Sequence, residues 1–391
     1  MTPEPWSAGD DVLRLTPDVE QLEFGGFVSK FLAERCGETE VRRLMEDDLG
    51  YDPGVWSQAS EQLGLAGLDV PEKYGGSGAG YREMAVVMEA LGGSLGCLPF
   101  YATSVLAVGA LLAADDEQAR GEYLPGIAAG RTTATVAAAE TGTSSASEVR
   151  TSAERDGGGF VLTGSKCFVV DGCTADLLVV VAQSPAGLSL FAVPGDAPGL
   201  TRTAMQTLDP TRKVARLTLD RAPGRLIGPE GSAPPVLDQL RDRAALALAC
   251  EQLGVASRAL SMAVAYAKTR MQFGRPIGSF QAVKHRCVDM AQRIEAALSA
   301  TQWAVAALAE NAENAENAEN AENVGIATAL ASVCSTDAAV FATAENVQVH
   351  GGIGFTWEHP AHLYFRRARS SALLHGSADD ARELLLRRLG V

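Results

Sequence analysis

The sequence lacks the features that mark membrane, secreted and common nucleotide-binding proteins. No apolar run reaches the roughly 18–20 uninterrupted residues of a membrane span. The opening residues, MTPEPW, have no basic region followed by an apolar core, so we expect no signal peptide. Neither G-x-G-x-x-G after a strand nor G-x-x-x-x-G-K followed by Ser or Thr is present, which excludes the usual phosphate-binding loops. We therefore expect a cytoplasmic protein with no membrane partner.

Positive charge and paired cysteines are also scarce. Lysine and arginine total 33 against 48 aspartate and glutamate residues, giving a formal net charge of −15. Nucleic-acid binding depends on basic surface, so this balance argues against it, although a local basic site can still hold an anionic substrate. The seven cysteines include no C-x-x-C pair, which predicts free, mostly buried thiols in a reducing compartment. The histidines show no H-E-x-x-H spacing, so we expect no metal site.

The sequence does contain helical patterns at both ends and a β pattern between them. The clearest helical stripe in the first region comprises Tyr81, Met84, Val87, Met88 and Leu91. Before it, the glycine- and proline-rich run 70–80 predicts a shaped loop. We expect a helical domain over residues 1–130, a β domain over 131–232 and a helical domain over 233–391.

Short β-rich runs fill the middle region, separated by glycine, proline and aspartate. Because no helical patterns lie between these runs, they favour a small antiparallel barrel or sandwich over alternating strands and helices. The runs cover residues 160–163, 167–170, 177–182, 188–193 and 214–219.

The third region is typical of long helices. Val283, Cys287, Met290, Ile294 and Leu298 are spaced four, three, four and four residues apart, which predicts a buried helix face in a bundle. Residues 310–323 repeat Glu-Asn-Ala, and a period of three drifts around a helix of about 3.6 residues per turn, so no apolar face forms. We interpret this repeat as a solvated insertion between two helices rather than a partner-binding segment.

Four segments resemble the acyl-CoA dehydrogenase family, and the resemblance covers nearly the whole chain. The two strongest are 266–286, YAKTRMQFGRPIGSFQAVKHR, and 348–360, QVHGGIGFTWEHP. Residues 65–78, LAGLDVPEKYGGSG, also match, and 164–172, GSKCFVVDG, match more weakly. The resemblance implies an α+β fold with an N-terminal helical domain, a central antiparallel β-barrel domain and a C-terminal four-helix bundle that mediates oligomerisation.

The resemblance also implies an FAD cofactor. Arg270 offers the planar cationic fork that suits a pyrophosphate, and two glycines allow the backbone to approach the cofactor closely. In the family these contacts come partly from a neighbouring subunit, which implies a homo- or hetero-tetramer. The positions here that match the family's FAD contacts are Arg270, Phe273, Gln281, Gln348, Gly351 and Gly352.

The β-domain half of the expected FAD site departs from the family pattern. In the family a Trp-x-Thr pair covers the flavin, and the matching residues here are Phe168 and Val170. Phe168 can still pack on the flavin, but Val170 has no hydroxyl for its N5 edge, although its backbone could serve. The preceding Thr-Glu-Pro-x-Ala-Gly-Ser-Asp stretch survives only as AETGTSSA at 139–146. We expect this half of the site to be altered.

The catalytic carboxylate that the resemblance requires is missing. Family members oxidise the Cα–Cβ bond of an acyl thioester, with a glutamate removing the α-proton while the β-hydrogen leaves as hydride. The two family positions of that glutamate correspond to His375, within LHGS, and to Ala244, ten residues before Gly254. Asp242 should face elsewhere on the helix, and Glu251, about 10 Å along the axis, could reach a cleft but not the usual position.

Three functions follow as alternatives. The chain could be an FAD-dependent acyl-CoA dehydrogenase with His375 as its weak candidate base, since imidazole titrates near neutrality. It could be the base-less, flavin-binding or scaffolding subunit of a heteromeric dehydrogenase, because residues 370–385 resemble actinobacterial subunits of that kind. It could be a divergent flavoenzyme that acts on a carrier-bound acyl group. The implied partners are an acyl-CoA or acyl-carrier substrate and an electron-transfer flavoprotein or similar acceptor. We interpret the basic run 366–369 as a solvated helix face, with a salt-bridged subunit contact as the alternative.

Overall fold

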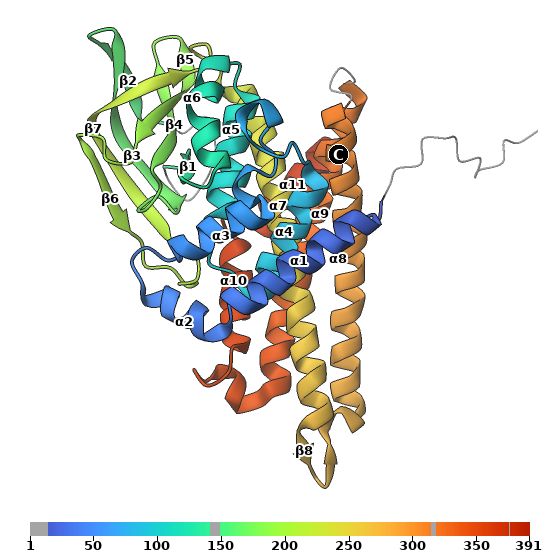
Figure 1. Ribbon diagram of the computed structural model, residues 1–391. Coiled ribbons are helices and arrows are strands. Elements are labelled where there is room, and N and C mark those ends of the chain that lie inside the picture. Colours follow the sequence, from blue (N-terminus) through green and yellow to red (C-terminus); the bar gives the residue numbers. More distant parts are fainter. Residues whose placement is uncertain (1–14, 141–148, 314–317, 375) are drawn as a thin grey trace, which may run out of the picture.

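Helices form the first part of the computed structural model, which describes residues 15–140, 149–313, 318–374 and 376–391 (Figure 1). The carboxylates of Asp18 and Asp52 accept hydrogen bonds from backbone N–H groups at the starts of two of these helices, which explains where they begin. The predicted stripe faces the core, where Met84 and Met88 are buried. The helices are α1 (Val19–Arg35), α2 (Glu38–Glu46), α3 (Pro53–Leu63), α4 (Tyr81–Ser94), α5 (Val108–Ala113) and α6 (Glu117–Ala128), with the short η1 (Leu65–Gly67), η2 (Glu72–Tyr74) and η3 (Tyr101–Ala107).

A closed β-barrel follows. Strand β4 pairs with β5, β5 with β7, β7 with β3 and β3 with β2, and one pair of residues between β2 and β4 closes the ring. These pairings are antiparallel except for β2–β4, and β1 also lies parallel to β4, so the sheet is mixed rather than fully antiparallel. The predicted runs 160–163 and 167–170 belong to one strand, β3. The strands are β1 (Ala134–Ala137), β2 (Ser152–Asp156), β3 (Gly159–Val170), β4 (Leu177–Ser184), β5 (Gly187–Pro194), β6 (Leu200–Ala204) and β7 (Val214–Ile227).

A bundle built around α9 completes the fold. Helix α9 packs against α7, α8, α10 and α11, so a fifth helix is added to the four that the resemblance implies. The predicted face of α8 is confirmed, since Met290 and Ile294 are buried in the bundle core. The elements are α7 (Ala233–Thr269), β8 (Met271–Gln272), β9 (Arg275–Pro276), η5 (Ile277–Ser279), α8 (Gln281–Glu313), α9 (Ala318–His350), η6 (Gly351–Phe355), α10 (Ala361–Ser371) and α11 (Ala378–Arg388).

The Glu-Asn-Ala repeat lies at the junction of α8 and α9, as its pattern predicts. Both helices continue into the repeat, because α8 ends at Glu313 and α9 begins at Ala318. Alanine and glutamate are strong helix formers, so helix propensity extends the two helices although the repeat has no apolar face. Residues 314–317 lie outside the described part of the chain.

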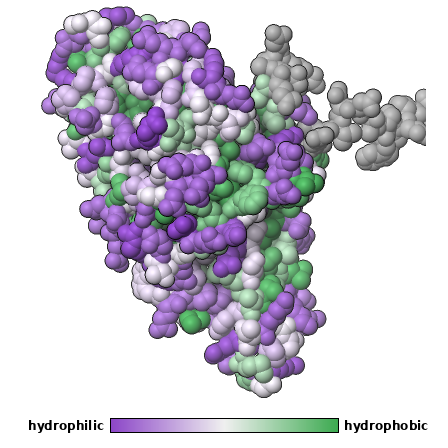
Figure 2. All heavy atoms as spheres, viewed as in Figure 1, coloured by the Kyte–Doolittle hydropathy of each residue, from purple (hydrophilic) through white to green (hydrophobic). Residues whose placement is uncertain are grey.

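One stretch, Asn323–Phe355, has the length and hydropathy of a membrane-crossing helix. It includes most of α9, which is surrounded by four other helices of the bundle. We therefore interpret it as the core helix of the bundle. In the view of Figure 2, hydrophilic residues cover much of the barrel, and hydrophobic patches gather along the bundle.

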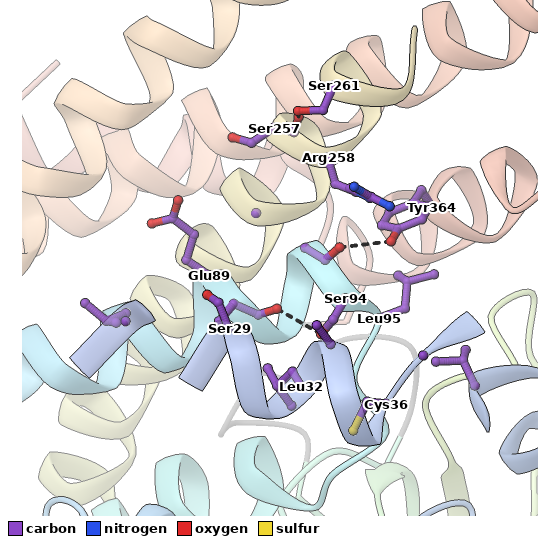
Figure 3. Close-up of a pocket in the computed structure, with 18 of the residues that line it drawn as sticks. Ser29, Leu32, Cys36, Glu89, Ser94, Leu95, Ser257, Arg258, Ser261 and Tyr364 are labelled. Carbon is purple, nitrogen blue, oxygen red and sulfur yellow. Dashed lines mark hydrogen bonds between the residues drawn. The ribbon is translucent and has the colours of Figure 1, made fainter. Parts of the chain in front are cut away.

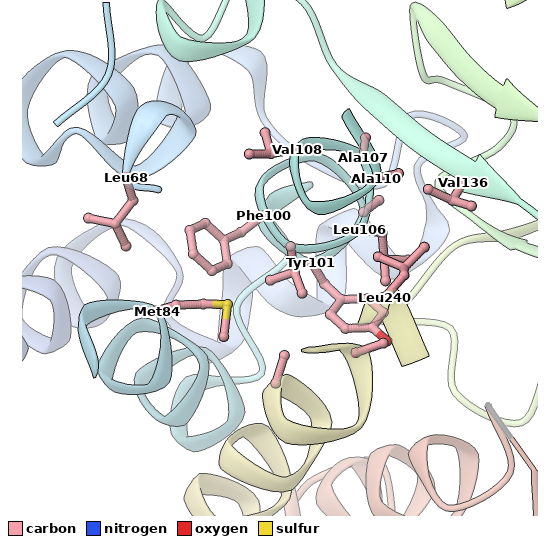
Figure 4. Close-up of a cluster of buried hydrophobic side chains, with 14 of the residues drawn as sticks. Leu68, Met84, Phe100, Tyr101, Leu106, Ala107, Val108, Ala110, Val136 and Leu240 are labelled. Atoms are coloured by element: carbon pink, nitrogen blue, oxygen red, sulfur yellow. The ribbon is translucent and has the colours of Figure 1, made fainter. Parts of the chain in front are cut away.

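The largest hydrophobic cluster joins the N-terminal helices, the barrel and α7, with Phe100, Tyr101 and Leu240 among its members (Figure 4). Helices α4 and α7 cross in backbone contact: a Cβ at Gly92 or Gly254 would lie 2.0 Å from the carbonyl oxygen of Glu251 or Glu89, respectively. All seven cysteines lie in the described residues and are free, and four of them are buried, as predicted.

Candidate functional site

The first group of predicted FAD contacts lies on the hairpin that links α7 to α8. Helix α7 ends at Thr269, Arg270 turns the chain into extended conformation, and β8 and β9 pair beyond it. Phe273 lies in the turn at φ 52° with 90% of its surface exposed. The Arg270 side chain is exposed and forms no ion pair with any described residue. Figure 1 shows this hairpin projecting from the end of the bundle.

The second group lies where α9 ends, beside the end of α7. The rings of Tyr266 and His350 stack at 4.3 Å between centroids, which holds the two helix ends together. Gly351 follows at φ 63°, and a Cβ at Gly351 or Gly352 would meet nothing within 4 Å. Gln348 is exposed in the last turn of α9, and Gln281 is exposed at the start of α8. This end of the bundle therefore presents open backbone, amides and an arginine to a molecule outside the chain.

The barrel half of the predicted site lies on β3. Phe168 has φ 56° and is 43% exposed, so its ring remains available for contact. Val170 is only 4% exposed, and its carbonyl oxygen already accepts a hydrogen bond of 2.6 Å from the Thr135 hydroxyl. The carbonyl of Val170 is therefore a poor replacement for the missing hydroxyl. Near it, Glu140 pairs with the buried Lys166 at 2.7 Å.

The structure does not bring the two halves together within one chain. The hairpin lies at the far end of the bundle from the barrel in Figure 1. Phe168 therefore belongs to one surface and Arg270, Phe273 and Gly351 to another. Among the described residues, no group of three or more His, Cys, Asp or Glu side chains is placed to hold a metal ion.

Neither position that matches the family's catalytic glutamate, 244 or 375, carries a carboxylate. Ala244 is 3% exposed and packs in the largest hydrophobic cluster with Leu240 and Tyr101. Asp242 points elsewhere, as expected, and binds Arg388 at 2.8 Å. His375 lies outside the described residues.

Glu251 lies instead at the centre of a buried ion network. Its carboxylate pairs with Arg212, which follows β6, and with Arg367 of α10 at 2.7 Å. Arg367 also pairs with Asp209 at 2.6 Å, and the Ser371 hydroxyl donates to Glu251 at 3.0 Å. The network ties the barrel, α7 and α10 together.

The charges of this network are mutually satisfied. Burial by itself would raise the pKa of Glu251, but the guanidinium groups of Arg212 and Arg367 lower it to about 2. A carboxylate held ionised by two arginines is a poor general base, because a base must accept the proton near working pH. The basic run 366–369 was predicted to form a solvated helix face. That prediction is wrong for Arg367, which is only 3% exposed. The ion pairs of Arg367 lie within the chain.

A second buried ion pair lies next to Ala244. Arg243 pairs with Asp69, donates to the carbonyl oxygens of Ser104 and Val105, and is 4% exposed. The guanidinium of Arg212 lies 5.6 Å from the ring centroid of Tyr101. Arg212, Glu251 and Tyr101 line a cavity of only about 30 Å³, enough for about one water molecule. Ala244 does not line this cavity and lies in packed core.

A larger cavity of about 360 Å³ lies on the opposite side of this network, between α7, α9 and α11. Asp242 and Ala245 line it from α7, and Gly376 and Ser377, the two residues after position 375, line it from the tail.

Sequence reasoning missed the roles of Arg212, Asp209 and Arg243. These residues meet Glu251, Arg367 or Asp69 only through the tertiary fold, from 39 to 174 positions away in sequence. One signal was available: Glu251 interrupts the apolar run ALALAC–LGVA, and a charged residue on a buried helix face requires a partner.

Comparisons with known proteins cover the whole of this architecture. Three family models match, described as the N-terminal domain of acyl-CoA dehydrogenase at residues 18–131, the middle domain at 134–221 and the C-terminal domain at 238–390. "Acyl-CoA dehydrogenase IpdE2" of Mycobacterium tuberculosis is 35% identical over 95% of this chain and 97% of its own length.

Two solved structures are similar along nearly their full length. A variant of the "Tcur3481-Tcur3483 steroid ACAD" has a TM-score of 0.84 and 30% identity, covering 95% of this chain and 98% of its own. A chain of the "ChsE4-ChsE5 complex from Mycobacterium tuberculosis" has a TM-score of 0.85 and 30% identity, covering 96% and 98%.

Proposed function

Because this chain belongs to the acyl-CoA dehydrogenase family of oxidoreductases, which act on the CH–CH bond of acyl-CoA thioesters, we propose that it is the base-less subunit of a hetero-oligomeric member. One observation carries the proposal: Ala244, at one family position of the base, is buried in the hydrophobic core, and the carboxylates described near it on α7, Asp242 and Glu251, are each paired with arginine. The partner would supply the glutamate and the acyl pocket. This chain would supply contacts to the cofactor and would stabilise the assembly of subunits.

The exposed end of the bundle fits FAD. Arg270, which forms no ion pair with a described residue, suits a pyrophosphate. Phe273 offers an aromatic face, and the open space beside Gly351 and Gly352 admits close approach. Bound FAD would supply the acceptor for the hydride that leaves the β-carbon. Gln281 and Gln348 would orient the cofactor through their amides, and Phe168 would cover the flavin of a site completed by another chain.

Two of the similar structures support a heteromer, because the name of each gives two different chains. Transferred to this chain, they favour an assembly of two kinds of subunit, which we propose to be a tetramer. We further propose a cytoplasmic location, an acyl-CoA substrate, an electron-transfer flavoprotein or similar acceptor, and domain boundaries after residues 130 and 232. The starts of β1 at Ala134 and α7 at Ala233 support those boundaries.

Co-expression tests the proposal. The full chain is purified alone and together with a homologue that keeps the glutamate, and flavin absorbance and reduction of an artificial acceptor by acyl-CoA are recorded. We expect turnover only from the complex, and its loss when the partner's glutamate becomes glutamine. Turnover by the isolated chain at the rate of the complex would overturn the proposal.

A second candidate is an enzyme active alone, with His375 as base. The cavity of about 360 Å³ beside Gly376 and Ser377 favours it, because an acyl group has space there. The variant His375→Ala separates the candidates: it should abolish turnover by the isolated chain if His375 is the base. It should leave the rate of the complex unchanged if the partner supplies the base.

A further inference from the structure

Three histidines gather where the end of α9 meets the start of α10. His350, in the last turn of α9, is 5% exposed, and its ring lies between those of Tyr266 and His359, at 4.3 and 4.1 Å between centroids. His362, in the first turn of α10, is 9% exposed, and its ring lies edge-on to that of Trp357 at 4.6 Å. The cluster therefore flanks η6, the segment that carries two of the predicted FAD contacts.

The hydrogen bonds of the cluster require uncharged rings. The Nδ1 of His350 donates to the carbonyl oxygen of Asn346 at 2.8 Å, which a neutral or a charged ring can do. The Nδ1 of His359 accepts from the backbone N–H of Ala361 at 3.2 Å, and only a ring without a proton at Nδ1 can accept. The Nε2 of His362 is buried without a hydrogen-bond partner among the described residues, so a proton there would find no acceptor. The closed arrangement is thus built for neutral His359 and His362.

The charges around the cluster also oppose protonation. Burial lowers the pKa of all three histidines. Arg42 of α2 lowers it further for His359 and His362, and Arg366 of α10 lowers it for His362. Glu38 of α2 acts in the opposite direction but already pairs with Arg42 at 2.8 Å. The positive end of the α10 dipole, next to both rings, disfavours a cation as well.

The ring stack has room for only one charge. Tyr266 can stabilise a charged His350 against its ring face, so His350 can be protonated in place. A second charge on His359 would then lie 4.1 Å away between ring centroids, where like charges in a half-buried site repel. Protonation of both rings therefore drives His359 out of the stack.

The neighbouring structure provides a fixed point and free space for such a movement. Tyr364 of α10 donates to the carbonyl oxygen of Gly93 in α4 at 2.9 Å (Figure 3), and Arg367 is held in the buried ion network. Pro360 lines a cavity of about 720 Å³ between α1, α4, α7 and α10. Residues 351–360 can therefore move while α10 stays anchored from Tyr364 onward.

We propose that His350, His359 and His362 form an acid-sensitive latch, which is closed while their rings are neutral and opens when protonation separates His359 from His350. Opening displaces η6, and with it Gly351 and Gly352, from the candidate cofactor surface. The latch itself is independent of the proposed function, whereas its effect on flavin rests on that function. Because the folded-state pKa values are lowered from about 6.5, the latch is complete above about pH 6.5 and weakens as pH falls below that value.

Hydrogen–deuterium exchange of the full chain at pH 7.5 and 5.5, corrected for the intrinsic pH dependence of exchange, tests the latch. We expect peptides covering residues 350–363 to lose protection about tenfold at pH 5.5, the equivalent of about one hydrogen bond. Peptides from α4 should keep their protection. His359→Asn should remove the response, because the amide oxygen can accept from Ala361 but is not protonated. His285→Asn, at the exposed start of α8, is the matched control and should keep the response.

Three results would overturn the latch. They are unchanged protection at pH 5.5, an equal loss of protection in the His359→Asn and His285→Asn variants, and an equal loss in the α4 peptides. Circular dichroism at pH 7.5 shows that each variant keeps its fold.

Flavin retention tests the second part of the proposal. The complex with a homologue that keeps the glutamate is gel-filtered at both pH values, and flavin absorbance is recorded. We expect the unaltered and His285→Asn complexes to lose flavin at pH 5.5 and the His359→Asn complex to retain it. Loss of protection at residues 350–363 with full retention of flavin would leave the latch in place and would overturn the cofactor surface of the proposed function.

Discussion

The middle and the end of α7 present opposite environments. From Arg243 to Glu251 the helix is buried, and both of these charged residues have ionic partners inside the chain. At Arg270 and the hairpin beyond it, an arginine without an ionic partner and the exposed ring of Phe273 face outward. A buried cluster whose charges are paired stabilises its own chain. An exposed charge without an ionic partner among the described residues is suited to binding another molecule.

The largest effect should come from breaking the buried network. Glu251→Gln leaves Arg212 and Arg367 buried with half of their negative partners, which should cost about 3–5 kcal/mol of unfolding free energy. Urea denaturation measures this loss. The control is Glu383→Gln in the exposed pair with Arg387, where a loss under about 1 kcal/mol is expected. Similar small losses in both variants would show that this network does not hold the barrel, α7 and α10 together.

Placing a glutamate at position 244, one of the two family positions of the base, should not produce an active enzyme. Ala244→Glu forces a larger, charged side chain into packed core, which should destabilise the chain by at least about 3 kcal/mol. No acyl-CoA oxidation should appear in the isolated variant, because Ala244 lies in packed hydrophobic core. A folded Ala244→Glu variant that oxidises acyl-CoA would contradict the proposed base-less role.

Acid should weaken the middle of α7 selectively. The folded-state pKa of Glu251 is lowered to about 2, so its stabilisation is present above the usual carboxyl range and is lost as pH falls from about 4.5 toward 2. We expect the stability difference between the unaltered chain and Glu251→Gln to be full at about pH 6 and to shrink below about pH 4. Thermal unfolding across that range measures it. A constant difference would show that the charge of Glu251 does not matter.

A substitution at the end of α7 should change the affinity for flavin rather than the stability of the chain. Arg270→Met removes a charge-assisted contact worth about 1.5–3 kcal/mol, so flavin affinity of the assembly should fall roughly ten- to hundredfold. Unfolding of the isolated chain should change by less than about 0.5 kcal/mol. Flavin absorbance after gel filtration is the readout, and Arg216→Met on the exposed face of β7 is the control. Unchanged flavin content in Arg270→Met would remove the hairpin from the cofactor site.

The fold was predictable because its signals are local. Spacing of Met84 and Met88 or of Met290 and Ile294 defines helix faces, and short β-rich runs bounded by glycine define strands. The parallel pairing of β1 with β4 and the fifth bundle helix were not predictable, because neither depends on a local pattern. The candidate FAD contacts came from a family resemblance, and their division between two surfaces came only from the structure.

By itself, the sequence determined the family, the order of helical and β regions, and the lack of a glutamate at positions 244 and 375. These follow from residue identity and from spacing along the chain. Only the tertiary structure decided that Glu251 is paired with two buried arginines. The physical reason is that ionic partners are set by proximity in space, and residues 116 positions apart, such as Glu251 and Arg367, carry no sign of it in sequence.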